Sequence, residues 1–145
     1  MKEIKKKEFV YILTHNIHQH VVKIGETKDH PEVRKNTLDR ATPNIGKFKV
    51  EWFKEVQNSK LTETLIKGLL EEYREPDKKE FFRILLPSAI DICEKVVEYV
   101  EKIELFVSEQ MALENHVRKL KFEFNDKLKN VSSEQYGGIP KDMLK

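Results

Sequence analysis

Short apolar runs alternate with polar segments over the first third of the chain, and this pattern predicts β-strands. The first run spans residues 9–13 and the second spans residues 21–24, where β-branched residues surround one lysine. The polar segment between them, residues 14–20, can form a hairpin loop. A third run, residues 48–56, alternates apolar and polar positions as a half-buried strand does. The sequence therefore predicts three strands, with the first two next to each other.

Two helices are predicted around the third strand. The first is expected over residues 31–40, because Asp29 can cap it and Pro31 suits a first helical turn. The second is expected over residues 60–74, where leucines recur at four-residue intervals, as on the core-facing side of an amphipathic helix. A short apolar run follows at residues 81–86 and can return toward the sheet.

The second half of the chain is predicted to be helical, because residues 88–136 contain neither glycine nor proline. One apolar stripe with 3–4 spacing covers residues 89–107, and a second stripe, out of phase with the first, covers residues 113–124. This pattern fits either one long helix with a phase shift or two helices that break near Ser108.

The first of these stripes is too long for three short strands to cover, and monomers rarely leave such patches open. We therefore expect residues 88–107 to pack partly on the sheet and partly against a second helix. That helix is either the segment 111–128 folded back or the same segment of a second subunit, which would make the protein a homodimer.

Composition limits the class of protein. The chain has 145 residues, 39% of them hydrophobic and 36% charged, which fits one domain with an appended element. No apolar run approaches the ~20 residues of a membrane span, and the lysine-rich N-terminus lacks the apolar segment of a secretory signal. The single cysteine, Cys93, excludes an internal disulfide and favours a reducing compartment. Because Cys93 lies in an apolar helical pattern, we expect its side chain to pack in the core. We expect an intracellular protein, in cytoplasm or nucleus, that is not secreted.

Positive charge is concentrated in the first part of the chain. Residues 1–87 hold 18 basic and 14 acidic side chains, whereas residues 88–145 hold 9 and 11. This imbalance is compatible with binding to nucleic acid and equally with an ordinary solvated surface. Three histidines cluster in the presumed hairpin loop, at positions 15, 18 and 20. Because a zinc site needs a fourth ligand, a solvated loop is a simpler interpretation than a zinc site.

Four polar side chains stand inside the predicted elements: Tyr11, Lys23, Arg34 and Glu63. Phosphodiester cleavage needs such a set. One group must position or deprotonate water, a cation must offset charge on the phosphoryl oxygens, and a carboxylate must hold a divalent metal. Because Mg²⁺ keeps several waters, one carboxylate is chemically sufficient.

The order and spacing of these residues resemble the GIY-YIG nuclease superfamily. The first triplet reads Phe9-Val10-Tyr11 and the second reads Lys23-Ile24-Gly25, followed by Glu26 and Thr27. An arginine lies nine residues after the glycine, a glutamate opens a later helix, and a Glu-Phe-Phe sequence follows at residues 80–82. This form of the second triplet resembles the one found in the branch of the superfamily from phages and large DNA viruses. Two departures are Phe9 in place of the usual glycine and Lys23 in place of the second tyrosine.

The resemblance implies an α+β fold, with a small three-stranded antiparallel sheet flanked by helices. The helical pattern of the second half of the chain adds a long C-terminal helical extension. The resemblance covers about residues 8–86, so the expected division is a nuclease domain at 1–87, a helical extension at 88–130 and a flexible tail at 131–145. It also implies a metal-dependent DNA endonuclease that uses Mg²⁺ or Mn²⁺.

The resemblance also implies roles for individual residues. Tyr11 would position or activate water, Arg34 would contact the scissile phosphate and Glu63 would bind the metal. Lys23 would act as a cation, or as a base if burial lowered its pKa strongly. Arg40 competes with Arg34 for its role, and the further candidates for substrate binding are Thr27, Lys28 and Arg40.

Two other readings stay open. The same fold can serve without turnover, as a DNA-docking or protein-interaction module. Alternatively, the protein is a structural one organised by the long helix, with fortuitous triplets. Convergence of the four candidate residues in space would favour the nuclease or the non-catalytic module over the structural protein.

Overall fold

The sheet has four antiparallel strands in the order β3-β1-β2-β4. The computed structural model describes residues 6–18, 20–41 and 46–134. The strands run over Glu8–His15 (β1), Val22–Thr27 (β2), Phe48–Val56 (β3) and Phe81–Phe82 (β4). The α+β class expected from the sequence is confirmed, whereas the expected strand number is one too low. The apolar run after the second helix adds β4, because Phe81 and Phe82 pair with Lys23 and Val22 at the open edge of β2.

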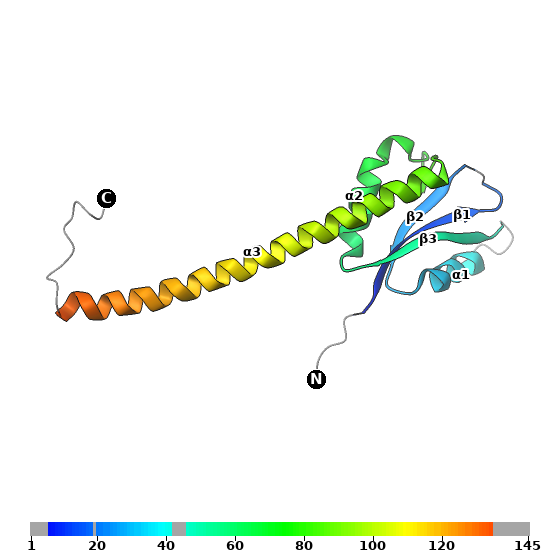
Figure 1. Ribbon diagram of the computed structural model, residues 1–145. Helices are drawn as coiled ribbons and strands as arrows, with labels where there is room; N and C mark the ends of the chain where they lie inside the picture. The colour runs from blue at the N-terminus through cyan, green and yellow to red at the C-terminus, as the bar shows by residue number, and fades with distance from the viewer. Residues whose placement is uncertain (1–5, 19, 42–45, 135–145) are drawn as a thin grey trace. The chain divides into compact units, whose positions relative to one another are not determined.

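Helices cover both faces of this sheet (Figure 1). The second helix, α2 (Ser59–Leu69), and the first turns of α3 (Leu86–Glu134) pack on one face, where their apolar residues meet β1 and β2. The first helix, α1 (Pro31–Ala41), lies on the other face. The buried core between this face and its helices consists of Ile12, Val22, Ile24, Ile66, Leu70, Phe82, Ala89, Cys93, Val96 and Val100.

Helix α2 begins at a cap and at a buried anchor. The Asn58 side chain accepts a hydrogen bond from the backbone N–H of Leu61 at 3.1 Å, which satisfies one of the free N–H groups of the first turn. Ser59 is fully buried, and its Oγ lies 2.8 Å from a carboxylate oxygen of Glu8 and 2.7 Å from one of Glu26. These contacts fix the start of α2 against β1 and β2, one turn before Glu63.

Helix α1 is fastened to β3 by one buried carboxylate. Asp39 accepts a hydrogen bond from the backbone N–H of Phe48 at 2.8 Å and forms an ion pair with Lys35 at 3.0 Å. Burial alone would raise the pKa of Asp39, but the Phe48 N–H and the Lys35 ammonium outweigh it and hold the pKa below its usual value. The ionised carboxylate therefore stabilises the connection between α1 and β3.

Replacement of Asp39 by alanine is expected to lower the free energy of unfolding by about 1.5–3 kcal/mol near neutral pH, the usual contribution of a hydrogen bond to a charged group. Because the folded-state pKa is depressed, this contribution is present above the ordinary aspartate pKa and is lost as pH falls through the folded pKa. Urea unfolding of wild type and variant at neutral and acidic pH measures this. A difference in stability that is equally large at both pH values would contradict the assignment.

Helix α3 is continuous from Leu86 to Glu134, so of the two sequence alternatives the single helix is observed and a break near Ser108 is wrong. Cys93 is fully buried in the core, as the packing interpretation expected. The chain divides into two compact units, residues 1–102 and 103–145. Of the expected tail, residues 131–134 are helical, and residues 135–145 lie outside the described part of the chain.

Within the described residues, no helix is both long enough and apolar enough to span a bilayer.

Candidate active site

The ring of Tyr11 lies over Gly25, its register partner on β2. A Cβ atom placed on Gly25 would stand 2.5 Å from the Tyr11 hydroxyl oxygen and 2.7 Å from the ring carbon that carries it. Only glycine leaves room for the ring at this point. The glycine of the second triplet and the tyrosine of the first are thus two halves of one packing arrangement, and Tyr11 is 1% exposed.

Replacement of Gly25 by alanine is expected to displace the Tyr11 ring, because phenol carbons cannot approach a Cβ atom so closely. Such overpacking costs about 1–3 kcal/mol of unfolding free energy. Gly68 on α2 is the matched control, because nothing lies within 4 Å of its added Cβ. Gly68→Ala should keep or raise the stability measured by urea unfolding, and equal losses in both variants would contradict the Tyr11 contact.

Arg34 is the cation that acts on Tyr11. It lies on α1, the helix on the Tyr11 face of the sheet, and its guanidinium lowers the pKa of the Tyr11 phenol. Burial raises the pKa of Tyr11, and the negative charges of Glu80 and Glu63 act in the same direction, whereas Arg34 opposes them. The phenol therefore stays protonated at neutral pH and carries one O–H donor beside a guanidinium.

Lys23 stands next to this pair as part of a charged chain. Its side chain is 8% exposed and forms a close ion pair with Glu80, and its ammonium lies 5.0 Å from the centre of the Phe81 ring. Glu80 is held in place because its carbonyl accepts the backbone N–H of Ile24 at 2.9 Å. Burial alone would raise the pKa of Glu80, but Lys23 and Lys67 outweigh it and lower that pKa.

Lys67 connects this chain to Glu63. Its ammonium is 3.2 Å from a Glu63 oxygen and 3.5 Å from a Glu80 oxygen. Glu63 lies in the second turn of α2, a helix whose apolar side packs on the face opposite Tyr11. Its charge nevertheless acts on Tyr11, and its ion-pair chain ends at Lys23 on the Tyr11 face. Glu63 thus reaches the site past the β2 edge.

The structure therefore brings together the four residues that the sequence singled out for catalysis: Tyr11, Lys23, Arg34 and Glu63. Two residues of the cluster, Lys67 and Glu80, were missed as site residues. A signal existed for both. Lys67 follows Glu63 by four residues on a helix, the spacing of an ion pair, and Glu80 opens the Glu-Phe-Phe sequence.

The three residues predicted to bind substrate are placed differently. Thr27 is buried, and its hydroxyl accepts the backbone N–H of Asp29 at 3.0 Å, so it shapes the turn after β2. Lys28 is exposed and forms an ion pair with Glu8 at 3.1 Å. Arg40 is exposed at the end of α1, where its Nε donates to the Asn36 carbonyl at 3.4 Å. Arg34, and not Arg40, is the arginine beside Tyr11.

Glu63 is the carboxylate with the chemistry to hold a divalent metal. Among the described residues, no three His, Cys, Asp or Glu side chains gather in a way that could hold an ion. A single carboxylate nevertheless suits Mg²⁺, which takes most of its ligands from water and from substrate phosphates. Lys67 is shared with Glu80, so it keeps an anionic partner when Glu63 binds a cation. The donor set fits Mg²⁺ or Mn²⁺.

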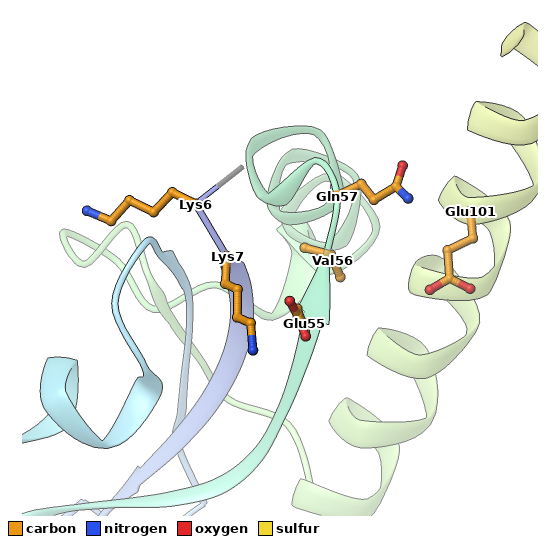
Figure 2. Close-up of a pocket in the computed structure, with 6 residues that line it drawn as sticks. All are labelled: Lys6, Lys7, Glu55, Val56, Gln57 and Glu101. Carbon is orange, nitrogen blue, oxygen red and sulfur yellow. The ribbon is translucent and has the colours of Figure 1, made fainter. Parts of the chain in front are cut away.

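A separate hollow lies away from this cluster. Its lining comes from the segment before β1, the end of β3 and one residue of α3, as Figure 2 shows: Lys6, Lys7, Glu55, Val56, Gln57 and Glu101. Two lysines and two glutamates contribute to its lining, and no predicted catalytic residue lines it.

Comparison with known proteins gives one family. The model of the T5orf172 domain matches residues 8–104, which include all four strands, α1, α2 and the first turns of α3. No curated protein and no solved structure matches the chain. Because the matched segment is about two thirds of the sequence and contains the whole candidate site, the chain belongs to the T5orf172 domain family.

Proposed function

We propose that this protein is a GIY-YIG-type DNA endonuclease that hydrolyses phosphodiester bonds with Mg²⁺ or Mn²⁺. The observation that carries the proposal is the convergence of a buried phenol, a guanidinium and a carboxylate from three different elements, β1, α1 and α2. A purely structural protein has no need to gather a buried phenol, a partly buried guanidinium and a buried carboxylate, because each group would be solvated more cheaply at the surface.

Each residue has a distinct task in this reaction. The Tyr11 phenol, protonated at neutral pH, orients the attacking water by hydrogen bonding, and the raised pKa makes a phenolate base unfavourable. Arg34 donates to the scissile phosphate, where a preorganised cation stabilises the charge that develops on the phosphoryl oxygens. Glu63 would hold a divalent metal, which would supply polarisation of the phosphate and assistance to the leaving oxygen.

Lys23 and Lys67 supply further positive charge to the same surface. Lys23 is paired with Glu80 and is therefore assigned the role of a cation in place of the base that the sequence left open. Glu80 holds both lysines in position through its two ion pairs, at the β2 edge where Glu63 arrives. Three cationic groups, Arg34, Lys23 and Lys67, stand against the two carboxylates Glu63 and Glu80, so the cluster has a net charge of +1, which favours a polyanion such as DNA.

The rival is a module of the same fold that binds DNA without cleaving it. Incubation of labelled duplex and branched DNA with the protein separates the two. In Ca²⁺, gel retardation measures binding; in Mg²⁺ or Mn²⁺, the appearance of shorter strands measures cleavage. The proposal expects binding in the first condition and cleavage in the second. Binding without any strand scission in either active metal would favour the rival, and no binding at all would refute both.

A further inference from the structure

A row of exposed apolar side chains runs along α3 within the second unit. It recurs with the 3–4 spacing of a coiled-coil seam, at the first and fourth positions of successive heptads. The exposed fractions are high for such large side chains: Phe106 60%, Leu113 53%, Val117 39%, Leu120 37% and Phe124 61%. Ile103 begins the row, and two polar residues, Gln110 and Lys127, occupy seam positions within it.

We propose that a second copy of this chain covers this seam as an antiparallel helix, with Val117 of one copy opposite Leu120 of the other. The proposal does not depend on nuclease activity. It rests on how charged and polar residues are distributed around the seam, since this distribution suits one orientation of the second helix and penalises the other.

A parallel pair in register would bring like charges together. Each seam residue would then face its own counterpart, so that Lys127 would meet Lys127 in the interior, where an unpaired ammonium is costly. The flanking positions would also conflict, because parallel helices place Glu109 beside Glu114 of the second copy, and like charges at these positions destabilise the pair.

The antiparallel register removes both conflicts. When Val117 faces Leu120, Leu113 faces Phe124 and Gln110 faces Lys127, so the two polar residues meet in two symmetry-related layers and the apolar residues between them meet one another. Gln110 can accept a hydrogen bond from the Lys127 ammonium through its side-chain oxygen. Polar residues at seam positions specify register in coiled coils, because a shifted pairing would bury them against apolar side chains.

The flanking residues agree with the same register. Antiparallel helices bring Glu114 beside Lys121 of the second copy, an opposite-charge pair that occurs twice in the dimer. Val107, 46% exposed, comes beside Leu128, 55% exposed, which extends the apolar seam at both ends. Position 103 falls opposite position 134, a glutamate and the last residue of α3, so the paired span covers the helical part of the second unit and ends at a polar residue.

Cysteine cross-linking of the full chain tests the orientation. The native Cys93 does not interfere, because it is fully buried and burial raises the pKa of its thiol to about 12. A Leu113→Cys variant, oxidised alone, should form little disulfide, because the two copies of position 113 lie ~16 Å apart along antiparallel helices in this register. Mixed with a Phe124→Cys variant, it should form the mixed disulfide in high yield. An Asn115→Cys variant, on the outer side of the helix, is the control that should cross-link with neither.

The outcomes decide the proposal. Efficient disulfide formation by Leu113→Cys with itself would show a parallel pair and overturn it, as would a monomeric mass for the wild-type chain by light scattering at micromolar concentration. Glu114→Lys adds an independent readout: the antiparallel register predicts about tenfold weaker dimerisation, from two reversed pairs, and recovery in the Glu114→Lys, Lys121→Glu double variant. Tighter dimerisation of Glu114→Lys alone would support the parallel arrangement and refute ours.

Discussion

Replacement of Glu63 by glutamine is expected to abolish metal-dependent DNA cleavage, with a rate loss of roughly 10³-fold, because a metal ion contributes several kcal/mol to stabilising the transition state. Glutamine keeps the shape of the side chain but removes the charge that holds the ion. The stability of the fold should change little, since Lys67 retains Glu80 as a partner at 3.5 Å. The rate of DNA cleavage in Mg²⁺, with thermal unfolding of the same samples, measures both effects.

Glu72→Gln is the matched control, because Glu72 is an exposed acid shortly after α2. It should cleave DNA at the wild-type rate. Calorimetric titration of Mn²⁺ provides a readout besides activity: binding should be lost in Glu63→Gln and retained in Glu72→Gln. Wild-type cleavage by Glu63→Gln would remove Glu63 from the mechanism.

Replacement of Arg34 by alanine is expected to lower the cleavage rate by about 10²–10³, the usual cost of removing one preorganised donor from developing negative charge. DNA binding should weaken much less, since Lys23 and Lys67 keep their charges. Loss of the Arg34 guanidinium also removes an effect that lowers the pKa of Tyr11. Single-turnover cleavage with saturating protein separates the chemical step from binding.

Arg40→Ala tests the choice between the two arginines of α1. Arg40 is exposed and bonded to its own helix, away from Tyr11, so its replacement should leave the chemical rate unchanged and at most weaken binding. If Arg40→Ala lost 10²-fold or more in rate while Arg34→Ala stayed active, the assignment made from geometry would be reversed.

Three of the strands, and the pairing of the first two, were predictable because hydrophobic period and hairpin spacing are local properties. The run at residues 48–56 matches β3 to the residue, and Tyr11 and Lys23 fall near each other because β1 and β2 are neighbours. The fourth strand was not predicted as such, because two phenylalanines are too short a run to show the apolar–polar alternation of a strand. Only the exposed edge of β2 makes them a strand.

The catalytic candidates were predicted from ordered motifs, but the electrostatics around them were not. The pair of Lys23 and Glu80 joins residues 57 positions apart, and no local pattern indicates which acid meets which lysine. The packing of Tyr11 on Gly25 was likewise invisible, since it depends on strand register. The continuity of α3 was left open because a shift in apolar phase does not distinguish a break from a change of partner.

Nicking of supercoiled plasmid by the wild-type protein, in Mg²⁺ and in EDTA, tests the central claim most directly. The account predicts conversion to open circles in Mg²⁺, none in EDTA, and none in Mg²⁺ with the Glu63→Gln protein prepared alongside. Plasmid that stays supercoiled in both Mg²⁺ and Mn²⁺, at protein concentrations that saturate DNA binding, would contradict it, as would equal nicking by wild type and Glu63→Gln.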